Sequence, residues 1–313
     1  MLPHLSLLPG ESLVSWAARS AQAQTGMDLP YVAAFTGLER AALLAPKPND
    51  LISIADLFGD NAQSLGDTAV HFHGPEMLRY RAEIFREDFI SWHTKAFCPI
   101  CLAEDPHPYG RLFWHIETTR ACSRHKVALV KTALARPDDI FSAPAQLYSA
   151  HHELADTADA NSEQPVSSLQ VYIERRLVGA SGPAWPDSQR ADQAARAARA
   201  LGISWLHGPK VTPSALTAGQ VIEAEIAGYE MVAKGEVGII SGLEDILLAS
   251  RKVPRQSRTP HSAFGEIWRL AAGIDDAGPI RPLLRNFVLE NFAIAGGTDV
   301  LGTKVPDRMR HNT

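Results

Sequence analysis

Apolar residues recur every three or four positions along much of the chain, the spacing that places them on one face of an α-helix. In the N-terminal region this pattern predicts four short helices separated by turns with Gly, Asp or Asn. Glu11 and Ser12 are expected to cap the first helix, whose apolar stripe ends at Gly26. The other three are predicted at residues 29–37, at residues 49–59 and after Asn61. Such a succession is typical of helix-turn-helix units, and equally of any small helical bundle.

The same spacing returns beyond residues 136–170, a polar stretch rich in Pro, Asp, Ala and Ser that suits a surface connection and a domain boundary. Most of the segments that follow end near a glycine, as helices commonly do. Helices are predicted within residues 166–179, 187–202, 217–235, 236–252, 262–274 and 278–297. The fold class is therefore expected to be mainly α. The sequence contains no internal repeat at a fixed period.

The composition limits the classes of protein to which the chain can belong. Of 313 residues, 45% are hydrophobic and 21% charged, as in an ordinary globular protein. The N-terminus lacks a basic and apolar leader, and no stretch is long and apolar enough to cross a bilayer, so we expect a cytoplasmic protein without membrane contact. A net charge of -5 argues against a protein that mainly coats nucleic acid, which needs a surplus of Lys and Arg.

All three cysteines fall in two pairs, Cys98-Pro-Ile-Cys101 and Cys122-Ser-Arg-His125, separated by 20 residues. They are too few and too clustered for a disulfide framework. Three thiolates and an imidazole at this spacing can converge on one ion, as in closed structural Zn²⁺ sites. We therefore predict one structural Zn²⁺ held by Cys98, Cys101, Cys122 and His125 in a small ribbon. Four protein ligands leave no open position for water, so the ion is expected to stabilise rather than catalyse.

With this ribbon, the chain is predicted to comprise a helix-turn-helix-like region at residues 1–75, a zinc-ribbon region at 76–135 and a helical C-terminal domain at 136–313. Cationic side chains surround the ribbon and also form a run without acidic residues at 250–258. Both groups could contact nucleic acid or a partner protein, although the run at 250–258 could equally be a solvated linker. These residues are Arg111, Arg120, Arg124, Lys126, Arg251, Lys252, Arg255 and Arg258.

Two motifs in this order resemble a known family. Residues 9–21 contain Pro-Gly-Glu-Ser-Leu followed by Ser-Trp, and the cysteine segment combines C-x-x-C, an acidic-Pro and Tyr-x-Arg-x-x-Trp run, and C-x-x-H. The chain is thereby similar to the TniQ family of transposition proteins over its first 130 residues or so. The matching positions of the second motif are Cys98, Cys101, Asp105, Tyr109, Arg111, Trp114, Cys122 and His125.

The resemblance implies a zinc-containing accessory protein with a helix-turn-helix that helps choose the target site of a Tn7-like or mercury-resistance-type transposon. Members of the family do not cut or join DNA. They act as adaptors that link target DNA, or an RNA-guided CRISPR complex, to an AAA+ ATPase that recruits the transposase. Whether the chain forms a homodimer stays open. Many relatives carry a second C-x-x-C after the histidine, whereas "VALVKTALARPDD" has none.

Other functions remain as alternatives. No phosphate-binding G-x-x-x-x-G-K-[ST] loop, G-x-S-x-G elbow or dinucleotide fingerprint is present, so we expect no enzymatic activity. A stand-alone, zinc-stabilised transcription regulator that binds DNA is the first alternative. A zinc hydrolase or deaminase using His115 and Glu117 is the second, but these residues follow the cysteine pair that they precede in known deaminases. His151 and His152 beside Glu153 could bind a metal or simply face solvent.

Overall fold

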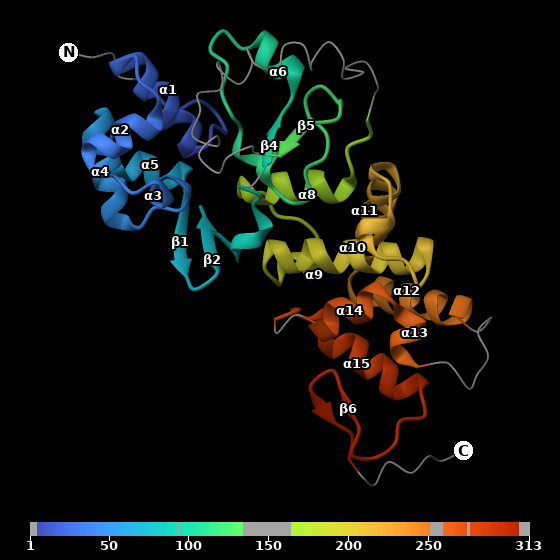
Figure 1. The fold of residues 1–313 in the computed structure, drawn as a ribbon. Coiled ribbons are helices and arrows are strands. Elements are labelled where there is room, and N and C mark those ends of the chain that lie inside the picture. The colour runs from blue at the N-terminus through green and yellow to red at the C-terminus, as the bar shows by residue number, and fades with distance from the viewer. Residues whose placement is uncertain (1–4, 93, 134–163, 251–258, 274–275, 307–313) are drawn as a thin grey trace. The chain divides into compact units, whose positions relative to one another are not determined.

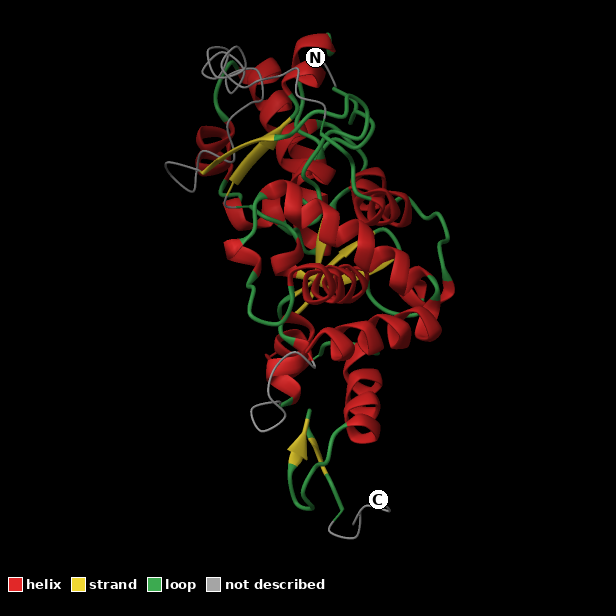
Figure 2. Cartoon of the chain, turned by 90° about the vertical axis from the view of Figure 1, so that its right-hand side faces the viewer, coloured by secondary structure: helices red, strands yellow, loops and turns green. Residues whose placement is uncertain are grey.

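The computed structural model describes residues 5–92, 94–133, 164–250, 259–273 and 276–306. By internal contacts the chain divides into two compact units, which we describe separately. Unit 1 contains Met1–Val166 and Leu177–Ala180, and unit 2 contains Ser167–Arg176 and Ser181–Thr313. Helices dominate the described part of both units, so the prediction of a mainly α fold is confirmed (Figures 1 and 2). The three-region division drawn from the sequence stays a prediction.

Unit 1 begins with a cluster of short helices. Ser12 caps α1, because its Oγ accepts the N–H of Ser15 at 3.2 Å, and Gly26 ends the helix with a φ of 70°. Glycines with positive φ also end α2 and α4. The helices are α1 (Leu13–Thr25), α2 (Leu29–Thr36), α3 (Arg40–Leu44), α4 (Pro48–Phe58) and α5 (Ala62–Thr68). The sequence predicted four of them, and α3 was not expected.

The first core of unit 1 lies among these helices. Trp16 of α1 is fully buried and meets Phe58 of α4 edge to face, with ring centroids 5.4 Å apart. Ile54 and Leu65 add fully buried aliphatic side chains from α4 and α5. Burial of side chains of this size stabilises the folded state by about 1.5–3 kcal/mol each, which is how helices too short to form alone are held.

Two small sheets follow in unit 1. Strands β1 (Val70–Gly74), β2 (Met77–Tyr80) and β3 (Glu83–Arg86) pair antiparallel in the order β1-β2-β3. Strands β4 (Thr94–Phe97) and β5 (Val130–Ala133) pair with Phe97 opposite Val130. Between β4 and β5 the chain forms α6 (Pro99–Glu104) and the 3₁₀ turn η2 (Leu112–His115), with a further 3₁₀ turn, η1 (Glu87–Phe89), after β3. The pairing of β4 with β5 closes the segment that carries the cysteines.

Unit 2 is a helical assembly that ends in a two-stranded hairpin (Figure 2). Helices α10 and α11 pack with their backbones in close approach at Gly202 and Gly228. Beside this crossing, the fully buried carboxylate of Glu225 accepts from Arg199 Nε at 3.0 Å and from Ser167 Oγ at 3.2 Å. The elements are α8 (Ser168–Leu177), α9 (Ala184–Asp187), α10 (Ala191–His207), η4 (Pro213–Ala215), α11 (Ala218–Ala233), α12 (Gly235–Ser250), α13 (Pro260–Phe264), α14 (Glu266–Gly273), α15 (Ile280–Asn291), β6 (Asp299–Val300) and β7 (Thr303–Lys304).

Within the described ranges, no helix combines the length and the apolar character needed to cross a bilayer. Most of the polar connection predicted at 136–170, including His151, His152 and Glu153, lies outside the described residues.

Candidate metal centre

The first pair of donors lies where β4 turns into α6. Cys98 is the N-cap of α6, and its Sγ accepts the N–H of Cys101 at 3.5 Å. Pro99 suits this place, because the first turn of a helix needs no N–H from it and its φ is already helical. The helix start thus turns both sulfurs inward, and Cys98 and Cys101 are almost completely buried.

The second pair lies on a tight turn before β5. Cys122 donates its N–H to the carbonyl of Val127 at 2.8 Å and accepts the N–H of Lys126 at 2.7 Å. Lys126 closes the turn with a φ of 54°, a left-handed conformation that is uncommon for residues other than glycine. The turn holds Cys122 and His125 on the same side of the ribbon as the first pair.

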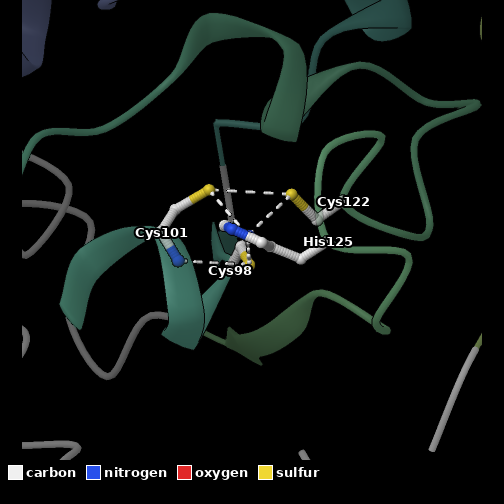
Figure 3. Close-up of side chains that lie close together, drawn as sticks. All are labelled: Cys98, Cys101, Cys122 and His125. Atoms are coloured by element: carbon white, nitrogen blue, oxygen red, sulfur yellow. Dashed lines mark hydrogen bonds between the residues drawn. The ribbon is translucent and has the colours of Figure 1, made fainter. Parts of the chain in front are cut away.

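The four side chains point toward one another (Figure 3). Their donor atoms all lie within 4.8 Å of one another, and within the described residues this is the group of His, Cys, Asp and Glu side chains that could hold a metal. Cys101 Sγ lies 3.6 Å from Cys122 Sγ and 3.3 Å from His125 Nδ1. The other Sγ to Nδ1 distances are 3.4 Å from Cys98 and 3.7 Å from Cys122.

These distances fit the chemistry of Zn²⁺. With Zn–S near 2.3 Å and Zn–N near 2.0–2.1 Å, the edges of a tetrahedron measure about 3.8 Å between sulfurs and about 3.6 Å from sulfur to nitrogen. Three thiolates and one imidazole are also a donor set that closed zinc sites use. Cys98, Cys101, Cys122 and His125 would therefore hold one Zn²⁺, which would supply structural cross-linking.

The thiols influence one another's ionisation. The pKa of Cys101 is raised because its thiol is hydrogen-bonded to Cys122 and Cys98 and is buried. The pKa of Cys122 is lowered because hydrogen bonds from Cys101 and Cys98 stabilise its thiolate. Crowded sulfurs thus favour one negative charge over three, and only a cation among them would allow all three to ionise.

A carboxylate outside the donor set orients the imidazole. Glu104, the last residue of α6, accepts from His125 Nε2 at 3.1 Å, so that Nδ1 faces the sulfurs. Arg124 Nη2 lies 2.8 Å from the same carboxylate oxygen. A second hydrogen bond on a ligating histidine fixes both its tautomer and its ring orientation. Glu104 was not identified from the sequence, although it follows Cys101 by only three residues.

The donors are part of the second core of unit 1. Phe97 and Leu102 flank the first pair of donors, and Trp114, Val127 and Leu129 complete the cluster of buried side chains around the sulfurs. A bound metal and apolar packing would therefore stabilise the same small region, which is too small to build a core alone.

The two sequence motifs lie in direct contact. The N–H of Gly110 donates to Ser15 Oγ at 2.8 Å, and its carbonyl accepts from the N–H of Ser12 at 2.9 Å. Leu112 donates its N–H to the carbonyl of Gly10 at 3.0 Å. A Cβ at Gly110 would lie 3.4 Å from Cβ of Ser15, so this approach leaves little space for a larger residue. The loop between the donor pairs is thus bonded to the start of α1.

Glu11 stands at the centre of this contact rather than simply capping α1. Its buried carboxylate accepts from Ser15 Oγ at 3.0 Å, from Arg19 Nε at 3.1 Å and from Arg19 Nη2 at 2.8 Å. Its backbone pairs with that of Arg111 in an isolated bridge. From the sequence, Glu11 was expected only to cap α1 because it precedes the helix, and Arg19 was not identified.

The cations predicted to contact a partner occupy different environments. Arg111 is held inside the fold by Asp105, whose carboxylate lies 2.9 Å from Nη2, and by the rings of Tyr109 and Trp114 at 4.3 Å and 4.9 Å. Arg120 is half-buried, and Arg124 and Lys126 are exposed. Arg251, Lys252, Arg255 and Arg258 lie outside the described residues. Their role as contacts stays a prediction.

His115 and Glu117, the residues of the deaminase alternative, are not among the converging donors. His115 is buried against Trp92, and its Nδ1 lies 3.1 Å from the carbonyl of Ser91. Burial lowers the pKa of His115 to about 4. The neutral imidazole therefore has a structural role: it packs against Trp92 and bonds to the backbone of the segment that follows β3.

Comparison with known proteins agrees with the motifs. No match was found among curated proteins. The family model of TniQ matches residues 2–129, which include both motifs and all four converging donors. This family is associated with transposition. Over residues 2–129 the chain is thus similar to the TniQ family, as its two motifs predicted.

Proposed function

We propose that the protein is a non-catalytic adaptor for transposon target-site selection. It would link target DNA, or an RNA-guided complex, to an AAA+ regulator of transposition in the cytoplasm. The observation that carries this proposal is the TniQ match over residues 2–129. It is supported by a candidate metal centre whose four protein donors would saturate a zinc ion and leave no position for a substrate.

The metal centre would act as scaffold. The loop that it closes holds Gly110 against Ser12 and Ser15, and so connects the ribbon to the first helix. A rigid connection of this kind would present the N-terminal helices and the ribbon as one surface to a partner. Zinc would therefore affect partner binding through the geometry of this surface.

The proposal predicts a gene for an AAA+ ATPase beside this one, and the test is binding of that ATPase. Tagged full-length protein, purified with its metal, is immobilised and incubated with the ATPase and a non-hydrolysable ATP analogue. Retention of the ATPase, and its loss from the Cys98→Ala variant, is the expected result. Insertion sites mapped in cells with and without the gene should differ in their distribution along the target DNA.

Two results would reject the adaptor role. One is a complete lack of ATPase binding, whether or not target nucleic acid is present. The other is an insertion pattern unchanged by deletion of the gene. A tight, salt-sensitive complex with one defined duplex, formed without any partner, would instead support a stand-alone transcription regulator.

A further inference from the structure

A groove of about 950 Å³ in unit 1 lies apart from the metal centre. Its walls come from α4, α5 and the first two strands, β1 and β2, which follow one another along the chain (Figure 1). Leu51, Ile52 and Ala62 contribute apolar surface from the helices. The strands contribute the aromatic ring of Phe72 and the polar side chains of His71, His73 and Arg79. Neither sequence motif includes this groove.

The charge of the groove is opposite to that of the chain. The full sequence carries a net charge of -5, yet no Asp or Glu is among the residues that line the groove. Its charged side chains are Arg79 and Arg81, and Lys47 lies at its edge, with Nζ 5.9 Å from the centroid of the Phe72 ring. A concave surface with cations alone favours an anionic ligand.

The backbone of β2 explains why the two arginines are exposed. Leu78 and Tyr80 are buried, so the alternation of the strand turns Arg79 outward, opposite His71 of β1. Arg81 follows with a φ of 54°, at the turn into β3. Arg79 Nε donates to the carbonyl of Arg81 at 2.8 Å, and within the described residues neither guanidinium forms an ion pair.

Phe72 adds an exposed aromatic surface. This residue is 45% exposed, although a phenylalanine in a strand is usually buried. β1 is an edge strand, and the N–H of Phe72 bonds to the carbonyl of Pro46 at 3.2 Å, which fixes the backbone beside the groove. An aromatic ring with a lysine beside it, in a groove with apolar and cationic walls, is the combination on which unpaired bases stack.

We propose that this groove binds an unpaired polynucleotide strand. Arg79 and Arg81 would contact successive phosphates, and a base would stack on Phe72 beside Lys47. A duplex offers phosphates too, but its bases stay stacked on one another and cannot reach a ring in a groove. The inference deepens the proposed function, because a target or guide complex with an exposed single strand is a ligand that such an adaptor would meet.

The test measures the fluorescence anisotropy of labelled 20-nucleotide strands of mixed sequence, as DNA, as RNA and as duplex DNA, against the full-length protein with its metal. Arg79→Ala combined with Arg81→Ala should weaken single-strand binding at least tenfold and reduce the slope of log affinity against log salt by about 1.4, two contacts at about 0.7 each. Phe72→Ala should weaken binding about tenfold, and Phe72→Tyr should retain it. The DNA and RNA arms tell which strand is preferred.

Arg86→Ala is the matched control. Arg86 lies on β3 next to β2, but it is paired with Glu76 at 2.9 Å and does not line the groove, so its variant should bind as the wild type does. Unchanged melting temperature and metal content would establish that each variant is folded. The proposal is overturned if the wild type binds no strand at low salt, if duplex binds as tightly as single strand, or if the double variant binds normally.

ATPase binding separates this inference from the proposed function. If the double variant retains the ATPase and loses the oligonucleotide, both ideas stand. If the wild type retains the ATPase but binds no strand, only the groove is rejected. If strand binding depends on the groove but no ATPase is retained, only the adaptor role is rejected.

Discussion

At the scale of one residue, Glu104 is expected to affect zinc affinity although it is not a donor. Its carboxylate accepts from His125 Nε2 at 3.1 Å and so presents Nδ1 to the sulfurs. In Glu104→Gln the acceptor is neutral, and the imidazole is a weaker and less well oriented ligand. We expect zinc affinity to fall by about tenfold, measured by competition with a chromophoric chelator. Cys98→Ala, which removes a donor, should lose far more affinity.

Arg124→Ala serves as the comparison for Glu104→Gln. Arg124 pairs with the same carboxylate, but its side chain is 60% exposed, so its removal should change zinc affinity little. Equal affinity in Glu104→Gln and the wild type would show that Glu104 does not orient His125.

Glu11 and Arg19 form a buried ion pair. The Glu11 side chain is completely inaccessible and accepts three hydrogen bonds from Ser15 and Arg19. Glu11→Gln keeps the shape but removes the charge, leaving the largely buried guanidinium of Arg19 without its partner. We expect the free energy of unfolding to fall by about 3 kcal/mol, measured by chemical denaturation.

The control for Glu11→Gln is Glu76→Gln. Glu76 also pairs with an arginine, Arg86, at 2.9 Å, but its side chain is 63% exposed. Solvent screens such a pair, so the loss should stay below about 1 kcal/mol. Similar losses for the two variants would mean that burial does not distinguish the Glu11 pair.

The donors of the metal centre could be predicted from sequence because their spacing is local: each pair lies within one turn of chain. The roles of Glu104 and Glu11 could not. Glu104 meets His125 across 21 positions, and Glu11 meets Arg19 across 8 and the backbone of Arg111 from another motif. Each of these contacts joins segments that come together only in the folded chain, so a local sequence pattern cannot predict it.

At the scale of elements, the crossing of α10 and α11 depends on glycine. A Cβ built on Gly202 would lie 1.9 Å from the carbonyl oxygen of Ala224, which is backbone and cannot rotate away. Gly202→Ala must therefore separate the helices, and we expect unit 2 to lose roughly 3 kcal/mol or more of stability. Hydrogen exchange of peptides from α10 and α11 in the full chain would measure the loss.

Gly219→Ala is the control within α11. Nothing lies within 4 Å of a Cβ at Gly219, which lies in the first turn of α11, so Gly219→Ala should leave the helix at least as stable as in the wild type. Faster exchange in this variant, or unchanged exchange in Gly202→Ala, would contradict the role assigned to the crossing.

Helices were easier to predict than strands for a physical reason. The capped helices carry a clear apolar period and end at glycines such as Gly26. The strands of the first sheet have four or five residues, and their turns use Glu76 and Arg81 with φ of 58° and 54° instead of the glycine or asparagine that usually indicates a hairpin. The alternation of buried Leu78 and Tyr80 with Arg79 was therefore too short to recognise.

At the scale of the molecule, the two units differ in what stabilises them. Unit 1 contains the four converging donors, whereas the described part of unit 2 has a core of packed helices and no group of side chains placed to hold a metal. The sequence predicted a boundary beyond residue 135, and it could predict the ribbon, but not that the loop at Gly110 would bond to Ser12 and Ser15 of α1. That contact spans 95 positions between Gly110 and Ser15.

Removal of zinc tests this difference within one intact chain. Chelation takes away the cross-link between the two pairs of donors, so residues 94–133 should exchange their amide hydrogens much faster, as unit 1 loses several kcal/mol. The first turn of α1 should follow, because Ser12 and Ser15 bond to Gly110 of the released loop. Peptides of α10 and α11 should keep their protection, since their core contains no donor. Hydrogen-exchange mass spectrometry before and after chelation, with zinc restored as the control, would measure all three regions. Loss of protection in α10 and α11 together with the ribbon would show instead that the metal stabilises the chain as one cooperative body.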